Sequence, residues 1–248
     1  MSCERLRDHR RIWERKPVLA EVYAVWFEAL LAALPAGGRV LEAGAGPGFF
    51  SEYARTRKPG LRWVSMDLVE TPWNDVVADG LRLPFRNGSF DAMAAIDLVH
   101  HLALPASFFT ETARVLAPGG RLAVIEPWVT PLSYPVYKWL HQEGCHIRVD
   151  PWNPFATADG APKDAFDGDS GVVWRMVRDT PASRWGTLGF RPPRVTILNG
   201  FAYLLSLGFR DSSLLPRPLA PALLGLDRWT ARLAPLLGLR VLAVWDRG

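Results

Sequence analysis

The stretch that decides the fold is Val40-Leu41-Glu42-Ala43-Gly44-Ala45-Gly46-Pro47-Gly48, a short apolar run that ends in an acid and then turns to glycines. The run predicts a buried strand over 39–42, and residues 49–57 can form the helix that follows the turn. Glycine adopts the backbone angles of a sharp turn and lets a ligand lie against bare backbone. Because several nucleotide-binding folds share such a turn, its meaning depends on what surrounds it.

Four further strands are predicted downstream, and a carboxylate follows each of them within a residue or two. They are 61–66 before Asp67, 74–78 before Asp79, 90–96 before Asp97 and 121–125 before Glu126. A helix is predicted over 106–116, with a turn at 117–120. Strands separated by helices of this length pair in parallel, and ligands bind at the carboxyl ends of such strands. The carboxylates therefore predict a rim suited to a ligand with hydroxyls, amines or positive charge.

The chain divides into four parts within one predicted structural domain. We expect an N-terminal helical segment over 1–36, the ligand-binding core over 37–127, an insertion over 128–195 and a return to the core over 196–248. The insertion is rich in Pro, Trp and polar residues, and we interpret it as a lid of loops and short helices at 134–142 and 170–179. The last part reads as a helix over 197–206, a strand over 209–215, a Leu-rich helix over 219–236 and a strand over 239–245. The predicted fold class is α/β: a Rossmann-like, doubly wound, mostly parallel seven-stranded sheet with a lid inserted before the last two strands.

Composition excludes several classes of protein. The 248 residues are 49% hydrophobic and carry a net charge of +4, which suits a globular domain and gives no basic stripe for nucleic acid. The most basic stretch, 5–16, also contains acids and is interpreted as a solvated helix face. Two cysteines, Cys3 and Cys145, make no disulfide framework and favour a reducing, cytoplasmic setting. The sequence shows no apolar signal region and no run of 18 apolar residues, so we expect a soluble protein.

Residues 37–127 resemble the class I S-adenosylmethionine-dependent methyltransferases, and among them the type 11 methyltransferase domain. The first motif of that family is similar to VLEAGAGPG, and the segments that follow it resemble, in order, VADGLRLPF, FDAMAAIDLVHHL and RVLAPGGRLAVIEP. A weaker resemblance returns at 197–245.

The resemblance implies which residues hold the cofactor, S-adenosylmethionine. Glu42 would hold the cofactor's amino group, Asp67 its ribose hydroxyls and Asp79 its adenine amine. The full implied set is Glu42, Ala43, Gly44, Gly46, Asp67, Leu68, Asp79, Gly80, Leu81, Ile96 and Asp97. A carboxylate accepts two hydroxyls in a charge-assisted pair but would repel a ribose 2′-phosphate, which disfavours NADP.

The resemblance also implies the reaction, in which one methyl group moves to an acceptor and S-adenosylhomocysteine is released. We expect a small-molecule acceptor attacked at oxygen, nitrogen or carbon, with apolar, aromatic and lipid-like metabolites all open. Alignment of nucleophile, methyl carbon and sulfur can supply roughly 7–11 kcal/mol of the barrier, so the family needs no shared catalytic residue.

Two alternatives remain open. Tyr134 and Lys138 spell the Y-x-x-x-K of short-chain dehydrogenases, NAD(P)-dependent oxidoreductases. The glycine spacing G-x-G-x-G and Pro135, directly after the tyrosine, count against that alternative. The second is a non-catalytic protein that binds S-adenosylmethionine with the same fold.

Candidates for the acceptor side are histidines and aromatics. His101, His141 and His146 are candidate bases, because imidazole titrates near neutral pH, and Glu143 could orient one of the last two. Packed or surface histidines are the alternative for each. The spacing of His, Glu, Cys and Asp over 141–150 matches no zinc signature, so no metal is expected. The insertion's aromatics either line an apolar acceptor site or form the lid's own core: Tyr134, Tyr137, Trp139, Trp152, Phe155 and Trp174.

The stretch 214–239 mixes leucines and prolines with Arg217, Arg228 and Arg232, and Arg240 follows directly after it. It predicts either a helix that crosses between the last two strands or a basic amphipathic helix in peripheral contact with a membrane. The second interpretation would favour a lipid or quinone acceptor.

Overall fold

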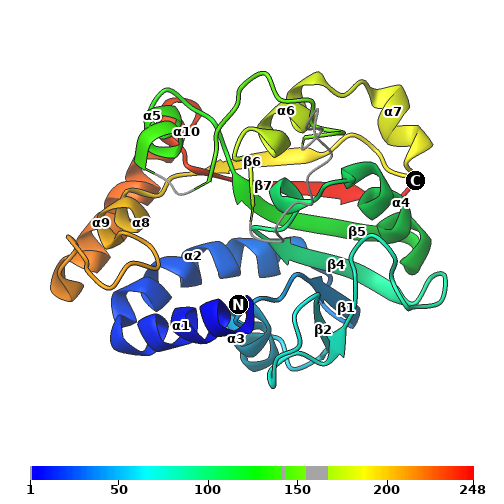
Figure 1. The fold of residues 1–248 in the computed structure, drawn as a ribbon, viewed down its shortest axis with the longest axis horizontal. Coiled ribbons are helices and arrows are strands. Elements are labelled where there is room, and N and C mark those ends of the chain that lie inside the picture. Colours follow the sequence, from blue (N-terminus) through cyan, green and yellow to red (C-terminus); the bar gives the residue numbers. More distant parts are fainter. Residues whose placement is uncertain (1, 141–142, 155–166) are drawn as a thin grey trace.

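One seven-stranded sheet with helices on both faces forms the frame of the computed structural model, which describes residues 2–140, 143–154 and 167–248 (Figure 1). Its strands are β1 (Gly38–Ala43), β2 (Leu61–Asp67), β3 (Val76–Val77), β4 (Phe90–Ile96), β5 (Leu116–Pro127), β6 (Arg194–Leu198) and β7 (Arg240–Asp246). They lie in the order β3-β2-β1-β4-β5-β7-β6. Strand β7 runs in the direction opposite to that of the other six. The predicted Rossmann-like, mostly parallel α/β sheet is confirmed.

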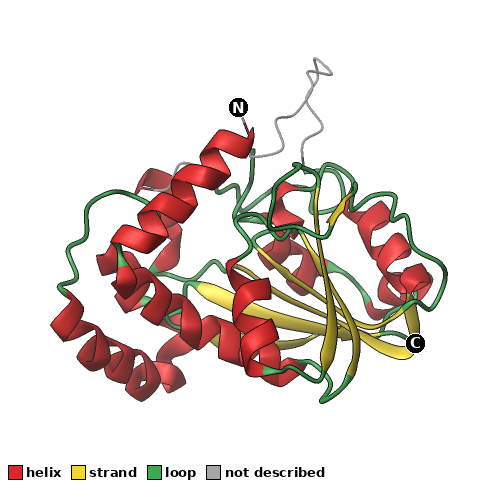
Figure 2. Ribbon diagram, turned by 90° about the horizontal axis from the view of Figure 1, so that it is seen from below, coloured by secondary structure: helices red, strands yellow, loops and turns green. Residues whose placement is uncertain are grey.

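Each face of the sheet has its own apolar core, because successive strand residues point to opposite sides. Val40 faces a core shared with α2 (Pro17–Ala33) and α3 (Phe49–Arg57), whereas Leu41 faces a core shared with α4 (Pro105–Val115). The sequence predicts helices in the regions of α2, α3 and α4. Figure 2 shows the helices on both sides of the sheet.

The sixth strand is not where the sequence predicts it. Residues 209–215 form bends rather than a strand, and β6 lies at 194–198, where the lid and a helix were expected to meet. Arg210-Asp211-Ser212-Ser213 has the composition of a turn, which explains the error. The β-branched alternation of Arg194-Val-Thr-Ile-Leu198 was the overlooked signal for an exposed edge strand. The helix predicted over 197–206 is correspondingly shorter, α8 (Phe201–Ser206).

The insertion contributes to two different places. Its first part, α5 (Ser133–Pro135) and the π-helical turn η2 (Val136–Leu140), lies near the pocket described below. Its helices α6 (Val172–Asp179) and α7 (Ala182–Thr187) instead join the core on the α4 face through Val172, Met176 and Trp185.

Two further elements complete the frame. The turn predicted at 117–120 lies inside β5, where the pairing with β4 shifts register. The predicted helix over 219–236 is broken into η3 (Arg217–Leu219), α9 (Ala220–Trp229), η4 (Thr230–Leu233) and α10 (Ala234–Leu237). At the other end of the chain, α1 (Ser2–Arg15) carries the basic stretch.

Candidate active site

The glycine turn closes β1 and opens α3 in the conformation that its sequence predicts. Gly44, Gly46 and Gly48 have φ of +67°, +51° and +80°, which residues with a Cβ rarely adopt. A Cβ on Gly44 would lie 2.8 Å from Cδ1 of Leu98. A Cβ on Gly46 would lie 3.9 Å from Cδ2 of Leu6, which is ordinary van der Waals contact with α1.

Asp67 lies beside the turn, at the end of β2. Its Oδ2 accepts the N–H of Gly46 at 2.8 Å, and its Oδ1 accepts the N–H of Val69 at 2.8 Å. The carboxylate therefore ties the glycine turn to the second strand. Two lone pairs of its oxygens remain for other donors.

Glu42, at the end of β1, is a buried acid with few partners. Its Oε2 accepts a hydrogen bond from Nε1 of Trp63 at 3.0 Å. Burial raises the pKa of Glu42 to about 8, against the opposing effects of Trp63 and Ser51. A cation brought next to this carboxyl group would favour its ionised form.

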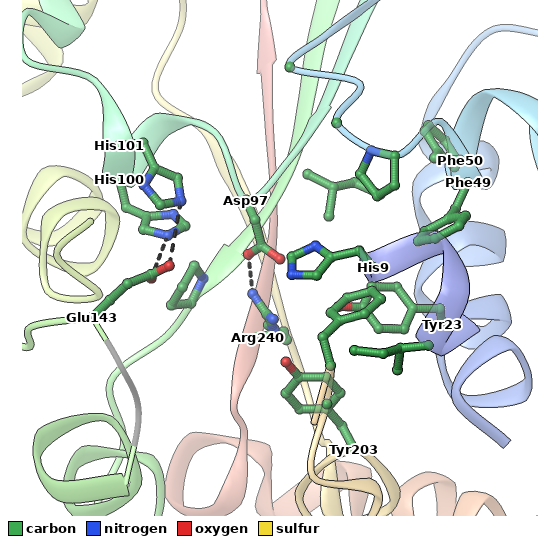
Figure 3. A pocket seen from close by; sticks show the side chains of 18 of the residues that line it. His9, Tyr23, Phe49, Phe50, Asp97, His100, His101, Glu143, Tyr203 and Arg240 are labelled. Carbon is green, nitrogen blue, oxygen red and sulfur yellow. Dashed lines mark hydrogen bonds and ion pairs between the residues drawn. The ribbon is translucent and has the colours of Figure 1, made fainter. Parts of the chain in front are cut away.

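A cavity of about 670 Å³ extends from the glycine turn (Figure 3). This volume lies in the range of about 300–1,000 Å³ typical of small-molecule sites. Of the predicted cofactor residues, Glu42, Gly44, Gly46, Ile96 and Asp97 line it. Aromatic side chains give much of the lining its apolar character: Tyr23, Phe27, Phe49, Phe50, Tyr137, Tyr203 and Phe209.

The remaining predicted cofactor residues lie outside the lining of this cavity. Asp79 follows β3, and its Oδ1 accepts the N–H of Leu81 at 2.8 Å. Gly80 lies over the ring of Phe108, because a Cβ there would be 3.5 Å from Cδ2 of that ring. Leu68 follows Asp67 and is 58% exposed.

Asp97 is held by Arg240, which the sequence analysis grouped with the basic residues of the C-terminal stretch and did not predict as a site residue. It has a φ of +53°, unusual for a residue with a side chain, and its carboxylate forms an ion pair with Arg240 of β7. The guanidinium of Arg240 is buried between the rings of Trp26 and Tyr203, at 4.9 Å and 5.3 Å from their centroids. One arginine in an otherwise apolar strand was the available signal.

The N-terminal helix α1 also lines the cavity, so the prediction of a solvated helix face for 5–16 is only partly right. Leu6 is buried, and the ring of His9 stacks on Phe209 at 4.4 Å. Burial, aided by Arg5, lowers the pKa of His9 to about 4. Arg10 donates to the carbonyl of Pro47 in the glycine turn at 2.7 Å. The helix therefore covers the glycine turn.

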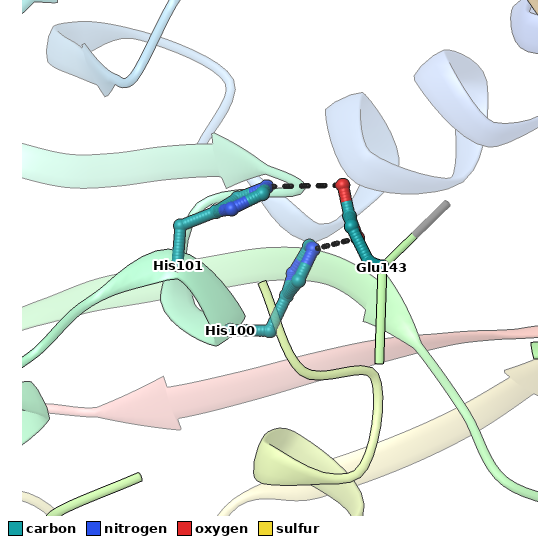
Figure 4. A group of neighbouring side chains, drawn as sticks. All are labelled: His100, His101 and Glu143. Carbon is teal, nitrogen blue, oxygen red and sulfur yellow. Dashed lines mark hydrogen bonds and ion pairs between the residues drawn. The ribbon is translucent and has the colours of Figure 1, made fainter. Parts of the chain in front are cut away.

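The polar end of the cavity is formed by His100, His101 and Glu143 (Figure 4). The histidines belong to the short helix η1 (Val99–His101) that follows β4. Nε2 of His100 lies 3.1 Å from Oε2 of Glu143, and Nε2 of His101 lies 3.7 Å from Oε1 of the same residue. Glu143 therefore contacts this pair, whereas the sequence analysis expected it to orient His141 or His146.

Buried Glu126, at the end of β5, contacts His100 on the side away from Glu143. Its Oε1 accepts the N–H groups of Leu98 and Val99, and its Oε2 contacts Nδ1 of His100 at 2.5 Å. Burial lowers the pKa of His100, but Glu126 and Glu143 outweigh burial and raise it to about 10. Burial and His100 lower the pKa of His101.

The other candidate bases lie elsewhere. His146 is paired with Asp169 at 2.6 Å and does not line the cavity, and His141 lies outside the described residues. Tyr134 and Lys138, the pair of the oxidoreductase alternative, do not line it either. Of the insertion's aromatics, Tyr137 lines it, Phe155 lies outside the described residues, and Trp152 packs edge-on against Phe109 and Trp185.

The strand order, the glycine turn and the acids at the strand ends define a class I methyltransferase domain. Comparison with known proteins agrees, because residues 41–124 match the family described as Methyltransferase domain. The chain therefore carries a domain of the class I S-adenosylmethionine-dependent methyltransferase family.

Curated relatives share part of the chain. An uncharacterized methyltransferase of Mycobacterium sp. (strain KMS) is 34% identical over 137 residues, 51% of this chain and 50% of the relative. A ubiquinone biosynthesis O-methyltransferase of Dechloromonas aromatica is 30% identical over 40% of this chain and 48% of its own. The mouse tRNA (carboxymethyluridine(34)-5-O)-methyltransferase ALKBH8 is 34% identical over 47% of this chain and 18% of its own. The chain thus spans about half the length, or less, of these relatives.

Solved structures share the fold. Geranyl diphosphate C-methyltransferase from Streptomyces coelicolor superposes with a TM-score of 0.55 at 18% identity, over 91% of this chain and 76% of its own. A methyltransferase from Archaeoglobus fulgidus gives 0.54 at 16% identity, over 92% and 94%.

Proposed function

We propose that this chain transfers a methyl group from S-adenosylmethionine to a small-molecule acceptor bound in the cavity. The observation that carries the proposal is one cavity that joins the glycine turn to the cluster of His100, His101 and Glu143. The cofactor would supply an activated methyl group on a sulfonium centre. The protein's contribution is to align the acceptor with that group and to exclude water.

The residues of the turn suit the cofactor. Glu42 offers a buried carboxyl group for an ammonium, and Gly44 and Gly46 bring backbone without a side chain to the wall of the cavity. Asp67, with two free lone-pair directions, is assigned the ribose hydroxyls. Ala43 and the residues after β3, Asp79, Gly80 and Leu81, complete the proposed site, with Leu68 beside Asp67.

The acceptor half of the cavity favours a molecule with an apolar or aromatic body and one polar nucleophilic group. The body would contact the aromatic wall, including Tyr23 and Tyr203, whereas the nucleophile would meet the polar cluster. Among the three candidate histidines, His101 is the one that we propose lies beside the nucleophile, because it lines the cavity. The attacked atom can be oxygen, nitrogen or carbon.

Two measurements test the proposal. Calorimetry should show binding of S-adenosylhomocysteine and none of NADPH, which separates the proposal from the oxidoreductase alternative. Transfer of a labelled methyl group should then be seen with phenols, quinols or related small acceptors, and an unmodified tRNA pool serves as the competing acceptor class. Cofactor binding without transfer to any acceptor would support the non-catalytic alternative instead, and preferential labelling of tRNA would overturn the small-molecule assignment.

We further propose peripheral contact with a membrane through the broken helix over 217–237. Several of its apolar side chains are exposed, and Trp229 is 81% exposed. Arg228 and Arg232 lie among them on the surface, a combination that suits an interface with anionic lipid. Among the described residues, no helix has the length and hydropathy to cross a bilayer.

Co-sedimentation with anionic vesicles tests this contact. Wild type should sediment with the vesicles at low salt, and Trp229→Ser should lose most of that binding. Equal recovery of both proteins in the supernatant would refute the contact.

A further inference from the structure

We propose that His100, His101 and Glu143 form the binding site of one divalent transition-metal ion in the wall of the cavity. Glu143 lies 43 positions after His100 in the chain, and the fold brings its carboxylate to one side of the two imidazoles, within reach of both (Figure 4). One ligand atom from each of the three residues lies within 4.8 Å of the others. Two imidazoles and a carboxylate are a ligand set of known catalytic metal sites.

Nδ1 of each histidine lies beside the kind of acceptor that a metal site requires. Nδ1 of His101 lies 3.0 Å from the carbonyl oxygen of Asp167, which can only accept, so this nitrogen carries the proton. Nδ1 of His100 lies against the carboxylate of Glu126. Metal-binding histidines nearly always donate their other ring N–H to a carboxylate or a carbonyl group, as both do here. The two Nε2 atoms both face Glu143, and a metal ion would take the place of the proton between His100 and Glu143.

The distances from Glu143 to the two histidines are close to those between ligands of one ion. Ligands at about 2.0–2.2 Å from a metal, at angles between octahedral and tetrahedral, are about 3.0–3.5 Å apart. The observed separations from Glu143 are 3.1 Å to His100 and 3.7 Å to His101. All three ligand atoms lie within 4.8 Å of one another, so a bound ion would draw His101 and Glu143 closer together.

A second grouping of possible ligands, Asp97 with His100 and Glu126, fits less well. Both oxygens of Glu126 are already engaged, one by the N–H groups of Leu98 and Val99 and the other by His100. The carboxylate of Asp97 is paired with Arg240. We therefore assign Glu126 the role of a positioning residue for His100 rather than that of a ligand.

Three protein ligands leave coordination positions open toward the cavity, as in catalytic rather than structural sites. If the proposed function holds, these open positions assign the class of acceptor. It is a molecule with an apolar body that presents a hydroxyl oxygen to the ion. The ion lowers the pKa of that hydroxyl, which loses its proton to solvent. The oxygen lone pair then forms the C–O bond to the methyl carbon, and the electron pair of the broken C–S bond stays on sulfur.

The test is metal binding to the whole chain, purified without a histidine tag and freed of metal with a chelator. Calorimetry with Zn²⁺ should show one site per chain, and Co²⁺ should give the visible absorption of a site with imidazole ligands. Removing a positioning residue typically weakens metal binding about 10–100-fold, so removing a ligand in Glu143→Gln or His101→Gln should weaken it by at least that factor. His146→Gln is the matched control, because it removes an imidazole that pairs with a carboxylate away from the cavity, and it should bind like wild type.

Thermal unfolding of each variant shows whether it is folded. Absence of a one-to-one site in wild type would overturn the proposal, as would wild-type affinity in both Glu143→Gln and His101→Gln. A loss in His146→Gln equal to that in Glu143→Gln would also overturn it. Because no cofactor or acceptor is present, a failed methyl-transfer assay with intact metal binding would refute the proposed function and leave the metal site standing.

Discussion

Replacement of Glu42 by glutamine should remove a pH dependence from cofactor binding. With a pKa of about 8, this carboxyl group is protonated at neutral pH in the free protein. The ionised form is the one that would pair with the ammonium group of S-adenosylhomocysteine. Binding must therefore first remove the proton, at a cost of about 1.4 kcal/mol for each pH unit below the pKa.

The magnitude follows from the ionised fraction. With a pKa of about 8, roughly 1% of Glu42 is ionised at pH 6 and half at pH 8. The affinity of wild type should rise about fiftyfold over this range, or about 2.3 kcal/mol, and level off above pH 9. One proton per ligand should be released at pH 6.

Calorimetry with S-adenosylhomocysteine between pH 6 and 9, in buffers of different ionisation enthalpy, measures both quantities. Glu42→Gln is nearly isosteric and cannot ionise, and any titration of the ligand itself appears equally in both proteins. The variant should bind about 10–100-fold more weakly at pH 8.5, because it lacks the charged partner. If wild type and variant followed the same pH curve, the role assigned to Glu42 would be wrong.

Three further predictions concern stability and binding. The folded-state pKa of Glu42 is raised from 4.5 to about 8, so the protonated carboxyl group stabilises the fold at low pH and this contribution is lost as pH rises from about 4.5 to 8. In denaturant unfolding, the free energy of unfolding of wild type should fall by up to about 1.4 kcal/mol per pH unit over this range, and that of Glu42→Gln should not. Asp67→Ala should lose most affinity for S-adenosylhomocysteine while its circular dichroism stays native; normal binding would contradict the assignment of β2. Asp97→Ala leaves the buried guanidinium of Arg240 without its carboxylate and should lower the free energy of unfolding by about 3 kcal/mol, whereas Asp97→Ala/Arg240→Met should recover part of that loss in thermal unfolding.

The sequence predicts well what depends on local pattern. The strand, turn and helix around Gly46 follow from an apolar run, glycines at consecutive sharp turns and a helical segment, all within twenty residues. The acids after β2 and β4 are placed by the same logic, because parallel strands end at one edge of the sheet. The edge strand β6 was missed, since an exposed strand needs no apolar face and carries only a short β-branched alternation.

The acceptor half could not be predicted because its contacts join residues far apart in the chain. The contact between His100 and Glu143 depends on how the insertion returns to the end of β4, and no local spacing encodes that path. Likewise, the charges of α1 are those of a solvated helix, and only the fold shows that His9 faces the cavity. The ion pair of Arg240 could have been predicted in part, because an arginine in a buried apolar strand must find a partner.

The cavity thus combines a half that the family shares with a half that it does not. The family match covers 41–124 and includes Glu42, Asp97 and both histidines of the cluster, whereas α1, Glu143 and residues 203–210 lie outside it. Binding of cofactor and choice of acceptor are therefore separable properties of this chain. A protein that keeps the two histidines but has no counterpart of Glu143 should bind the same cofactor and lack the proposed metal site. The acceptors of the relatives, which align over half of this chain or little more, are weak guides to the acceptor here, and replacing Glu143 is the direct way to test what the part outside the family match contributes.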